Sequence, residues 1–133
     1  MRSQKAWLTV EARKVAEFRR ATGWAGAAAD DDAAVPPTFP VALEHQSPPI
    51  VDLVIGMGYA AERLLHGEEV IDYPNGPLHV GDDLRGETRF VGSVTKRGTA
   101  GDFELLTTST DLYRPGGELA VRITRTFVAL PEG

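Results

Sequence analysis

The sequence predicts an α+β domain in which one helix covers an antiparallel sheet. Three long strand candidates, 83–96, 102–113 and 118–130, are rich in Thr, Val, Leu, Ile and Phe, and two short turns join them. A meander of this kind has one apolar face that another element must cover. The most apolar stretch of the chain, residues 50–65, is the candidate for the central helix that does so.

In the N-terminal half, apolar residues recur at i, i+3 and i+4 along 11–22, which predicts a helix. Thr9 is its candidate N-cap, and Gly23 is expected to end it. Residues 24–35 are rich in Ala and Asp, and we interpret their three consecutive aspartates as a solvated loop. The prolines within 36–49 predict an extended or turn-rich segment, because proline lacks a backbone donor.

Two glycines interrupt the predicted central helix. Gly56 and Gly58 weaken the helix predicted at 50–65 by about 1 kcal/mol each relative to Ala.

The C-terminal half of the chain shows the alternation of apolar and polar residues that is typical of strands. Residues 68–73 alternate weakly, and 74–77 break the run. In the last strand, one face is expected to carry Leu119, Val121, Ile123 and Phe127, and the other to carry Arg122, Thr124 and Thr126.

Length and charge exclude several classes of protein. The chain has 133 residues, enough for one core, and no internal boundary, so we expect one domain over 1–133. Its 14 basic and 19 acidic residues give a net charge of −5, which disfavours nucleic-acid binding. No apolar run approaches the roughly 20 residues of a membrane span, and the first residues have no long apolar stretch with a cleavage site, so we expect no secretory signal. We therefore expect a cytoplasmic protein without a membrane span.

The groups that carry chemistry are few. His45, His66 and His79 are not spaced as metal ligands, and the chain has no cysteine, so we expect no metal site. No serine lies in a nucleophile-elbow pattern. The Gly-x-Gly at 56–58 falls inside the predicted helix, which argues against a phosphate-binding loop and a nucleotide cofactor.

Two longer motifs indicate a family. Residues 35–40 read VPPTFP, and residues 65–82 read LHGEEVIDYPNGPLHVGD. They resemble the FAS1-like, or N-terminal, dehydratase domains of the MaoC family, which read APPTFP and then LHGEQ-x-F-x-Y-x-R-P-L-x-x-G-D. Residues 116–120, GGELA, are similar to the last hairpin turn of those domains. The order and spacing of the motifs extend the resemblance over nearly the whole chain.

The resemblance implies a hot-dog fold, with a long central helix wrapped by a curved antiparallel sheet and two such units paired side by side. It also implies a role with acyl thioesters of coenzyme A or acyl carrier protein, where water is added or removed across the 2,3-bond of (R)-3-hydroxyacyl chains. That reaction needs an Asp and a His that face one water. A backbone N–H at a helix N-terminus polarises the thioester carbonyl.

The sequence departs from the family's hydratase motif, Gly-Asp-x-Asn-Pro-x-His. When residues 21–23 are aligned with the usual Ala-x-Gly, whose Gly begins the motif, Trp24 stands at the Asp position and Ala29 at the His position. Ala27 and Ala28 fall where Asn-Pro would lead towards the His. The resemblance therefore implies a non-catalytic partner domain that shapes the acyl tunnel, while a second hot-dog domain supplies the Asp and His.

The VPPTFP motif corresponds to the place where a catalytic half starts its central helix. Thr38 and Phe39 have N–H groups that can donate to a thioester, whereas Pro37 has none. Trp24 is a candidate for the tunnel wall or an anchor of its loop, and His66 is a candidate for substrate contact or a structural residue at a helix end. The candidate substrate-binding residues are thus Pro37, Thr38, Phe39, Trp24, His66 and Gly67.

Two further readings of the function remain open on the sequence. A self-sufficient homodimeric thioesterase or hydratase would use another carboxylate, with His45 and Asp52 as the weak candidates for a displaced acid–base pair and the aspartates at 30–32 as a weaker one. A non-enzymatic acyl-CoA-binding module needs no such pair. Both a homodimer and a heterodimer with a catalytic subunit agree with the sequence.

Overall fold

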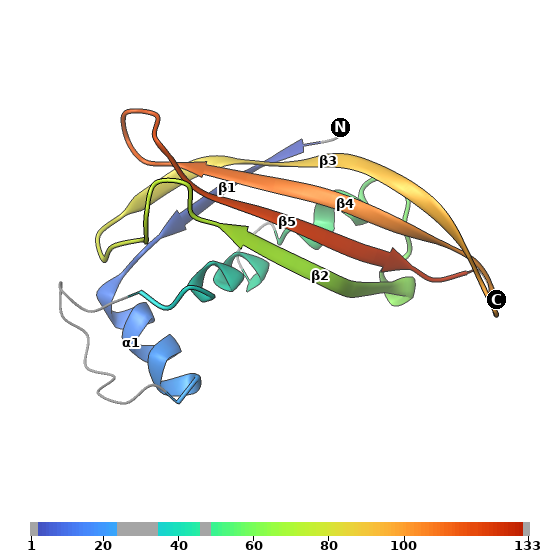
Figure 1. Cartoon of the computed structure of the whole chain (residues 1–133), viewed down its shortest axis with the longest axis horizontal. Coiled ribbons are helices and arrows are strands. Elements are labelled where there is room, and N and C mark those ends of the chain that lie inside the picture. The colour runs from blue at the N-terminus through green and yellow to red at the C-terminus, as the bar shows by residue number, and fades with distance from the viewer. Residues whose placement is uncertain (1–2, 24–34, 46–48, 132–133) are drawn as a thin grey trace.

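A five-stranded antiparallel sheet dominates the computed structural model, which describes residues 3–23, 35–45 and 49–131. Short helices lie on one side of the sheet (Figure 1). The strand order is β1-β3-β4-β5-β2. The strands are β1 (Ser3–Thr9), β2 (Leu64–Asp72), β3 (Asp83–Gly98), β4 (Gly101–Tyr113) and β5 (Leu119–Ala129). None of the helices in the described residues is long and apolar enough to cross a membrane.

The predicted meander forms the middle of the sheet. β3, β4 and β5 follow one another in hairpins, and the two turns fall where the sequence indicates. Gly101 opens β4 at φ 123°, and Gly116 and Gly117 both take φ 101° in the second turn, a region that favours glycine. The predicted alternation of β5 is confirmed at Val121 and Phe127, which are buried.

The first strand, β1, is not among the predicted elements. Ala6 and Leu8 are buried, Lys5 is exposed and Trp7 is half-buried, which is the alternation of a strand with one covered face. β1 pairs antiparallel with β3, a strand that begins more than seventy residues later in the chain. A run this short does not by itself predict a strand, because its pairing partner lies far along the chain.

The first helix, α1 (Ala12–Ala21), confirms the prediction, and the chain leaves it at Gly23 with φ 80°. The predicted cap is wrong. Glu11 is the N-cap residue and makes no capping bond with its side chain, while Thr9 belongs to β1. The Thr9 hydroxyl donates instead to the Asp83 carboxylate at 3.2 Å, so it ties β1 to β3.

The single central helix predicted over 50–65 is wrong in its extent. Helix α2 covers only Val51–Ile55, and Gly58 at φ 104° turns the chain away. A 3₁₀ turn, η2 (Ala61–Arg63), follows, and Leu64 already begins β2. Glycines lower helix stability and supply the positive φ that ends a helix, so the apolar run is divided between helix and strand.

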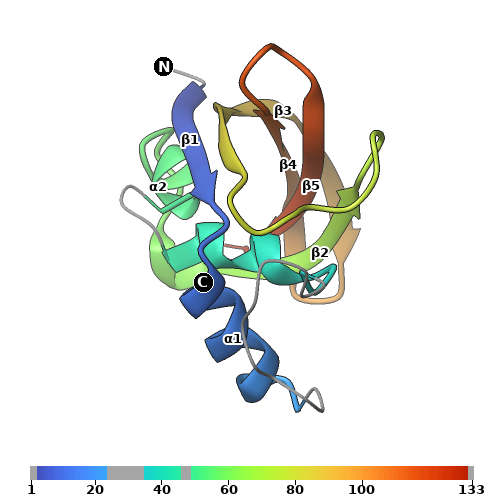
Figure 2. The same cartoon turned by 90° about the vertical axis from the view of Figure 1, so that its left-hand side faces the viewer.

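A second short element shares the covering role. The 3₁₀ helix η1 (Phe39–His45) forms within 36–49, where the sequence predicts an extended or turn-rich segment. Figure 2 shows the sheet curving from β1 round to β2, with this segment in the opening between them. Phe39 is 2% exposed and Val54 of α2 is fully buried. The core therefore lies between the inner face of the sheet and these two short helices.

Candidate functional site

The two sequence motifs meet at one cavity of about 290 Å³, which we call the motif cavity. Its lining consists of Val35, Pro37, Tyr73, Gly76, Pro77 and Leu78. The Tyr73 hydroxyl donates a hydrogen bond to the Pro37 carbonyl oxygen. This bond holds the VPPTFP segment against the turn that follows β2, so residues distant in sequence form one wall.

The motif cavity is apolar, and Tyr73 is the titratable group of its lining. Burial raises the pKa of Tyr73 to about 12, so the phenol stays neutral near pH 7 and acts as a donor. The lining residues include neither a carboxyl group nor an imidazole. Such a cavity can hold an apolar chain, but its walls cannot take up and return a proton at neutral pH.

The candidates Thr38 and Phe39 differ in what their amides do. The Phe39 N–H donates to the Pro36 carbonyl at 2.9 Å and closes a turn. Within the described residues, the Thr38 N–H has no acceptor, and its side chain is exposed. The Phe39 ring packs edge-to-face on Phe18 at 5.6 Å between centroids, so it belongs to the core. Of the two amides, that of Thr38 is the one open to a ligand.

His66 and Gly67 lie at a β-bulge in β2, away from the motif cavity. The pairing with β5 shifts between His66 and Glu68, so Gly67 is the extra residue. A Cβ atom at Gly67 would lie 3.2 Å from the Thr126 carbonyl oxygen, which favours glycine there. His66 is exposed, and its ring centroid is 5.7 Å from that of Phe127. It lies inside a strand rather than at a helix end.

The remaining candidates are not brought together. Trp24 and the aspartates at 30–32 lie outside the described residues, and of His45 only the backbone is described. Asp52 is exposed in the first turn of α2. A His45–Asp52 pair therefore stays a prediction. In the described ranges, no group of three or more His, Cys, Asp or Glu side chains is placed to hold a metal ion.

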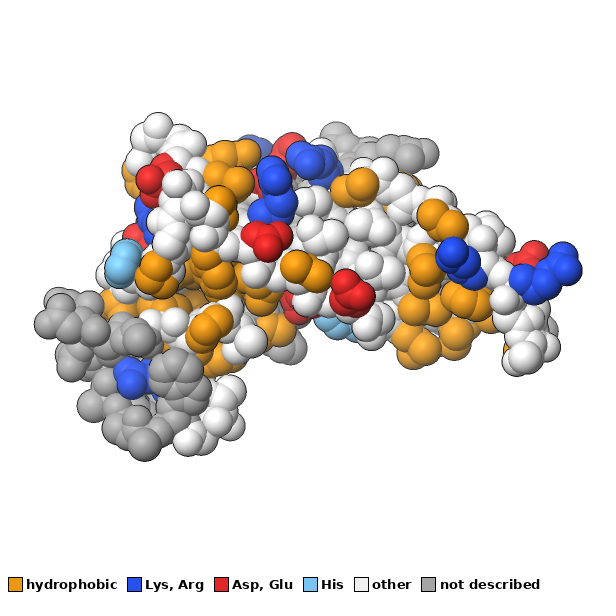
Figure 3. Space-filling view, in the orientation of Figure 1, with side chains coloured by type: hydrophobic (Ala, Val, Ile, Leu, Met, Phe, Trp, Pro, Cys, Tyr) orange, Lys and Arg blue, Asp and Glu red, His pale blue; other side chains and the backbone are white. Residues whose placement is uncertain are grey.

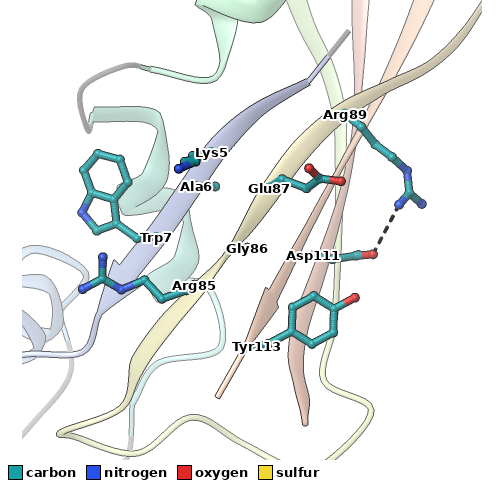
Figure 4. Close-up of a pocket in the computed structure, with 9 residues that line it drawn as sticks. All are labelled: Lys5, Ala6, Trp7, Arg85, Gly86, Glu87, Arg89, Asp111 and Tyr113. Carbon is teal, nitrogen blue, oxygen red and sulfur yellow. Dashed lines mark ion pairs between the residues drawn. The ribbon is translucent and has the colours of Figure 1, made fainter. Parts of the chain in front are cut away.

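A groove of about 660 Å³, which the sequence did not reveal, lies on the outer face of the sheet (Figure 4). Its side chains come from alternate positions of β1, β3 and β4: Lys5, Trp7, Arg85, Glu87, Arg89, Asp111 and Tyr113. At its floor, a Cβ atom on Gly86 would lie 1.8 Å from the Asp111 carbonyl oxygen. Only glycine lets β3 approach β4 this closely.

Asp111 is the electrostatic centre of this groove. It accepts hydrogen bonds from Arg122 Nε at 2.7 Å and Nη2 at 3.1 Å, and Arg89 Nη1 lies 3.6 Å away. The bond from Arg122 holds the pKa of the Asp111 carboxyl below its usual value. The carboxylate therefore stays ionised, and the groove offers ion pairing rather than proton transfer.

A second polar network crosses the inner face. Arg125 is fully buried, and its Nε lies 3.2 Å from Glu69 Oε1. Its Nη1 donates to the Thr110 hydroxyl at 3.0 Å, and that hydroxyl is 2.6 Å from the hydroxyl of Thr88. The network connects β2, β5, β4 and β3 through the core. An arginine on the covered face breaks the pattern predicted for β5.

The chain also matches a family model. Residues 1–122 match the model described as the FAS1-like, dehydratase domain region. The chain belongs to this dehydratase family. The resemblance of its motifs to MaoC-like dehydratase domains is thereby confirmed. A search of curated protein sequences found no match.

Solved structures share the architecture of this FAS1-like dehydratase chain. The HadBC (3R-hydroxyacyl-ACP dehydratase) complex of Mycobacterium tuberculosis is similar with a TM-score of 0.74, 15% identity and 96% coverage of each chain. HtdX of the same organism is similar with a TM-score of 0.69 and 23% identity, and the match covers 97% of this chain and 51% of HtdX. The ChsH1-ChsH2 complex, also of M. tuberculosis, is similar with a TM-score of 0.67 and 14% identity. The match covers 98% of this chain and 84% of that chain. These likenesses confirm the predicted hot-dog fold.

Proposed function

We propose that this chain is the substrate-binding, non-catalytic half of an (R)-specific acyl-thioester dehydratase or enoyl hydratase that acts in the cytoplasm. A catalytic hot-dog partner supplies the Asp and His, and this chain holds the acyl part of an acyl-CoA or acyl-ACP. The observation that carries the proposal is the motif cavity. It is built from the family's own motifs, it is apolar, and its titratable group is a tyrosine with a pKa of about 12.

Two further observations support a division of labour. Trp24 and Ala29 stand where the hydratase motif has its Asp and His, so the sequence lacks both proton-transfer groups there. HadBC and ChsH1-ChsH2 are complexes, as their names state. In the proposal, the open amide of Thr38 donates to the thioester carbonyl oxygen, and Pro37 and Tyr73 contact the acyl chain.

The direct test is hydration of crotonyl-CoA. We expect no turnover by this chain alone. A hot-dog subunit that carries Gly-Asp-x-Asn-Pro-x-His should turn over more substrate when it is mixed with this chain than when it is assayed alone. Full turnover by the lone chain would contradict the proposal and favour a self-sufficient hydratase, with His45 and Asp52 as the next residues to replace. Binding of acyl-CoA without any gain in turnover would favour a non-enzymatic module.

A matched pair of variants tests the cavity itself. Pro37→Glu adds a carboxylate to the apolar lining, whereas Pro74→Glu adds the same charge outside the lining, and both prolines are exposed. We expect Pro37→Glu to weaken acyl-CoA binding by at least about tenfold in calorimetry, because an acyl chain in the cavity would have to displace the water around the added carboxylate. Pro74→Glu should change it little. Equal losses would remove the motif cavity as the acyl site.

A further inference from the structure

The groove on the outer face of the sheet, which we call the outer-face groove, is more positive than the chain as a whole. Its charged lining consists of three cationic side chains and two carboxylates: Lys5, Arg85, Arg89, Glu87 and Asp111. Arg122, outside the lining, already binds the Asp111 carboxylate through two hydrogen bonds. Three cations therefore face one further carboxylate, on a chain whose net charge is −5. Figure 3 shows basic and acidic side chains grouped at the upper edge of the view, where β3 and β4 run.

The three cations are held only weakly by other side chains. Among the described residues, Lys5 takes part in no ion pair. Arg85 pairs with Asp83 at 3.4 Å, with side chains 70% and 48% exposed, so water competes for both. Arg89 Nη1 lies 3.6 Å from Asp111 Oδ2, which is beyond hydrogen-bond distance. The N–H groups of these cations are therefore available to a bound anion.

Aromatic side chains lie beside the cations. In the register of the sheet, Trp7 is directly opposite Arg85, which is directly opposite Tyr113. Lys5 is a diagonal neighbour of Arg85, and such neighbours are about 7–8 Å apart, which two long side chains can bridge. Figure 4 shows Arg85 extending from β3 towards Trp7, whereas Glu87 extends the other way, towards β4. The β1 side of the groove can therefore bind a flat ring next to an anionic group.

The size of the outer-face groove and this combination of side chains restrict the class of ligand. Its volume of about 660 Å³ lies within the range of about 300–1,000 Å³ that is usual for sites that bind small molecules. A nucleoside phosphate has both features that the lining fits. Its base stacks on an aromatic ring, and its phosphate oxygens accept charge-assisted hydrogen bonds from lysine and arginine.

We infer that the outer-face groove binds a nucleoside phosphate, with Trp7 stacked on the base and Lys5 and Arg85 bound to the phosphates. Glu87 is directly opposite Lys5 and forms no ion pair among the described residues, so its negative charge lowers the affinity for the ligand. The inference goes beyond the proposed function, because this groove shares no lining residue with the motif cavity.

Calorimetry with three probes tests the two halves of the ligand. ADP has the ring and the phosphates, pyrophosphate has the phosphates alone, and adenosine has the ring without a charge. We expect ADP to bind at least about tenfold more tightly than either of the others. Absence of ADP binding would overturn the inference. Pyrophosphate that binds as tightly as ADP would also overturn it, because the ring would then contribute nothing.

Substitutions assign the contacts to named side chains. We expect Lys5→Ala to weaken ADP binding by about tenfold and Trp7→Ala by at least about fivefold, since each removes a direct contact. Lys14→Ala removes an exposed lysine of α1 and should change little. Glu87→Gln should tighten ADP binding by about threefold or more, a gain that a disturbed fold does not produce. Equal losses in Lys5→Ala and Lys14→Ala would contradict the assignment.

Fluorescence reports on the stacking directly. The chain has two tryptophans, so in Trp24→Phe the signal comes from Trp7 alone. We expect saturating ADP to quench that signal, and an unchanged signal would overturn the stacking on Trp7.

Coenzyme A carries an adenine nucleotide as well, so competition identifies the source of the ligand. Competition with ADP that Lys5→Ala weakens would assign the groove to the nucleotide end of coenzyme A, and absence of competition would assign it to a free nucleotide. A chain that binds no ADP but raises the turnover of a catalytic partner would overturn this inference and leave the proposed function intact. A chain that binds ADP without raising turnover would do the reverse.

Discussion

Two arginines on β5, three positions apart, form ion pairs on opposite faces of the sheet. Arg125 faces inward, and its side chain is fully buried beside Glu69, which is 14% exposed. Arg122 faces outward, and its side chain is 46% exposed beside Asp111, which is 6% exposed. The outer contact is the shorter of the two, 2.7 Å against 3.2 Å, but only the outer arginine keeps water as an alternative partner. The comparison teaches that burial, rather than distance, decides what the loss of each pair costs.

The largest effect is expected at the inner pair. Arg125→Ala leaves the Glu69 carboxylate beside the core without its cation, so we expect the free energy of unfolding to fall by about 3–5 kcal/mol in urea titration. The double variant Arg125→Met/Glu69→Leu, which replaces both charges by apolar side chains, should recover most of that loss. If Arg125→Ala cost less than about 1 kcal/mol, burial would not distinguish the two pairs.

An intermediate effect is expected at the outer pair. Asp111→Asn keeps the shape but removes the charge that Arg122 and Arg89 bind, and we expect a loss of about 1–2 kcal/mol at pH 7. Because the folded-state pKa of Asp111 lies below its ordinary 3.8, its stabilisation is present above pH 3.8 and is lost as the pH falls further. Urea midpoints of the two proteins should therefore converge below that pH. A constant difference would contradict the assigned cause.

The smallest effect is expected on α1, where Arg13 and Glu17 pair at 3.3 Å with side chains 89% and 52% exposed. Arg13→Ala should change the free energy of unfolding by less than about 0.5 kcal/mol, because both ions stay hydrated without each other. Thermal unfolding in low and high salt gives the measurement. A loss as large as that of Asp111→Asn would show that exposure does not rank these pairs.

The parts of the fold that the sequence predicts are those with a local signal. The helix at 11–22 and the strands of the meander are predicted by the periodicity of apolar residues within a single segment. The turns are predicted by their glycines, which can adopt positive φ. β1 and the outer-face groove depend on pairing with β3, far along the chain. No window of sequence contains both partners, so neither could be read in advance.

The candidate site divides in the same way. The motifs contain both Pro37 and Tyr73, but only Pro37 is a candidate from the sequence, and the contact between the two residues is seen only in the folded chain, where the turn after β2 reaches the VPPTFP segment. Phe39 shows the reverse. Its place in the motif suggests a ligand contact, and the fold uses its ring in the core against Phe18. The type of a residue and its motif thus do not determine whether its side chain packs in the core or faces a ligand.

The strand order also sets the sequence of events when the chain is made. β1 leaves the ribosome first, yet its partner β3 begins only at Asp83, and β2 must wait for β5. The hairpins of β3, β4 and β5 close over short loops, so they are the segments that can assemble first. Strands β1 and β2 must therefore remain unpaired until β3 and β5 are made. A nascent chain that stalls before Asp83 has strand sequences but no sheet to join.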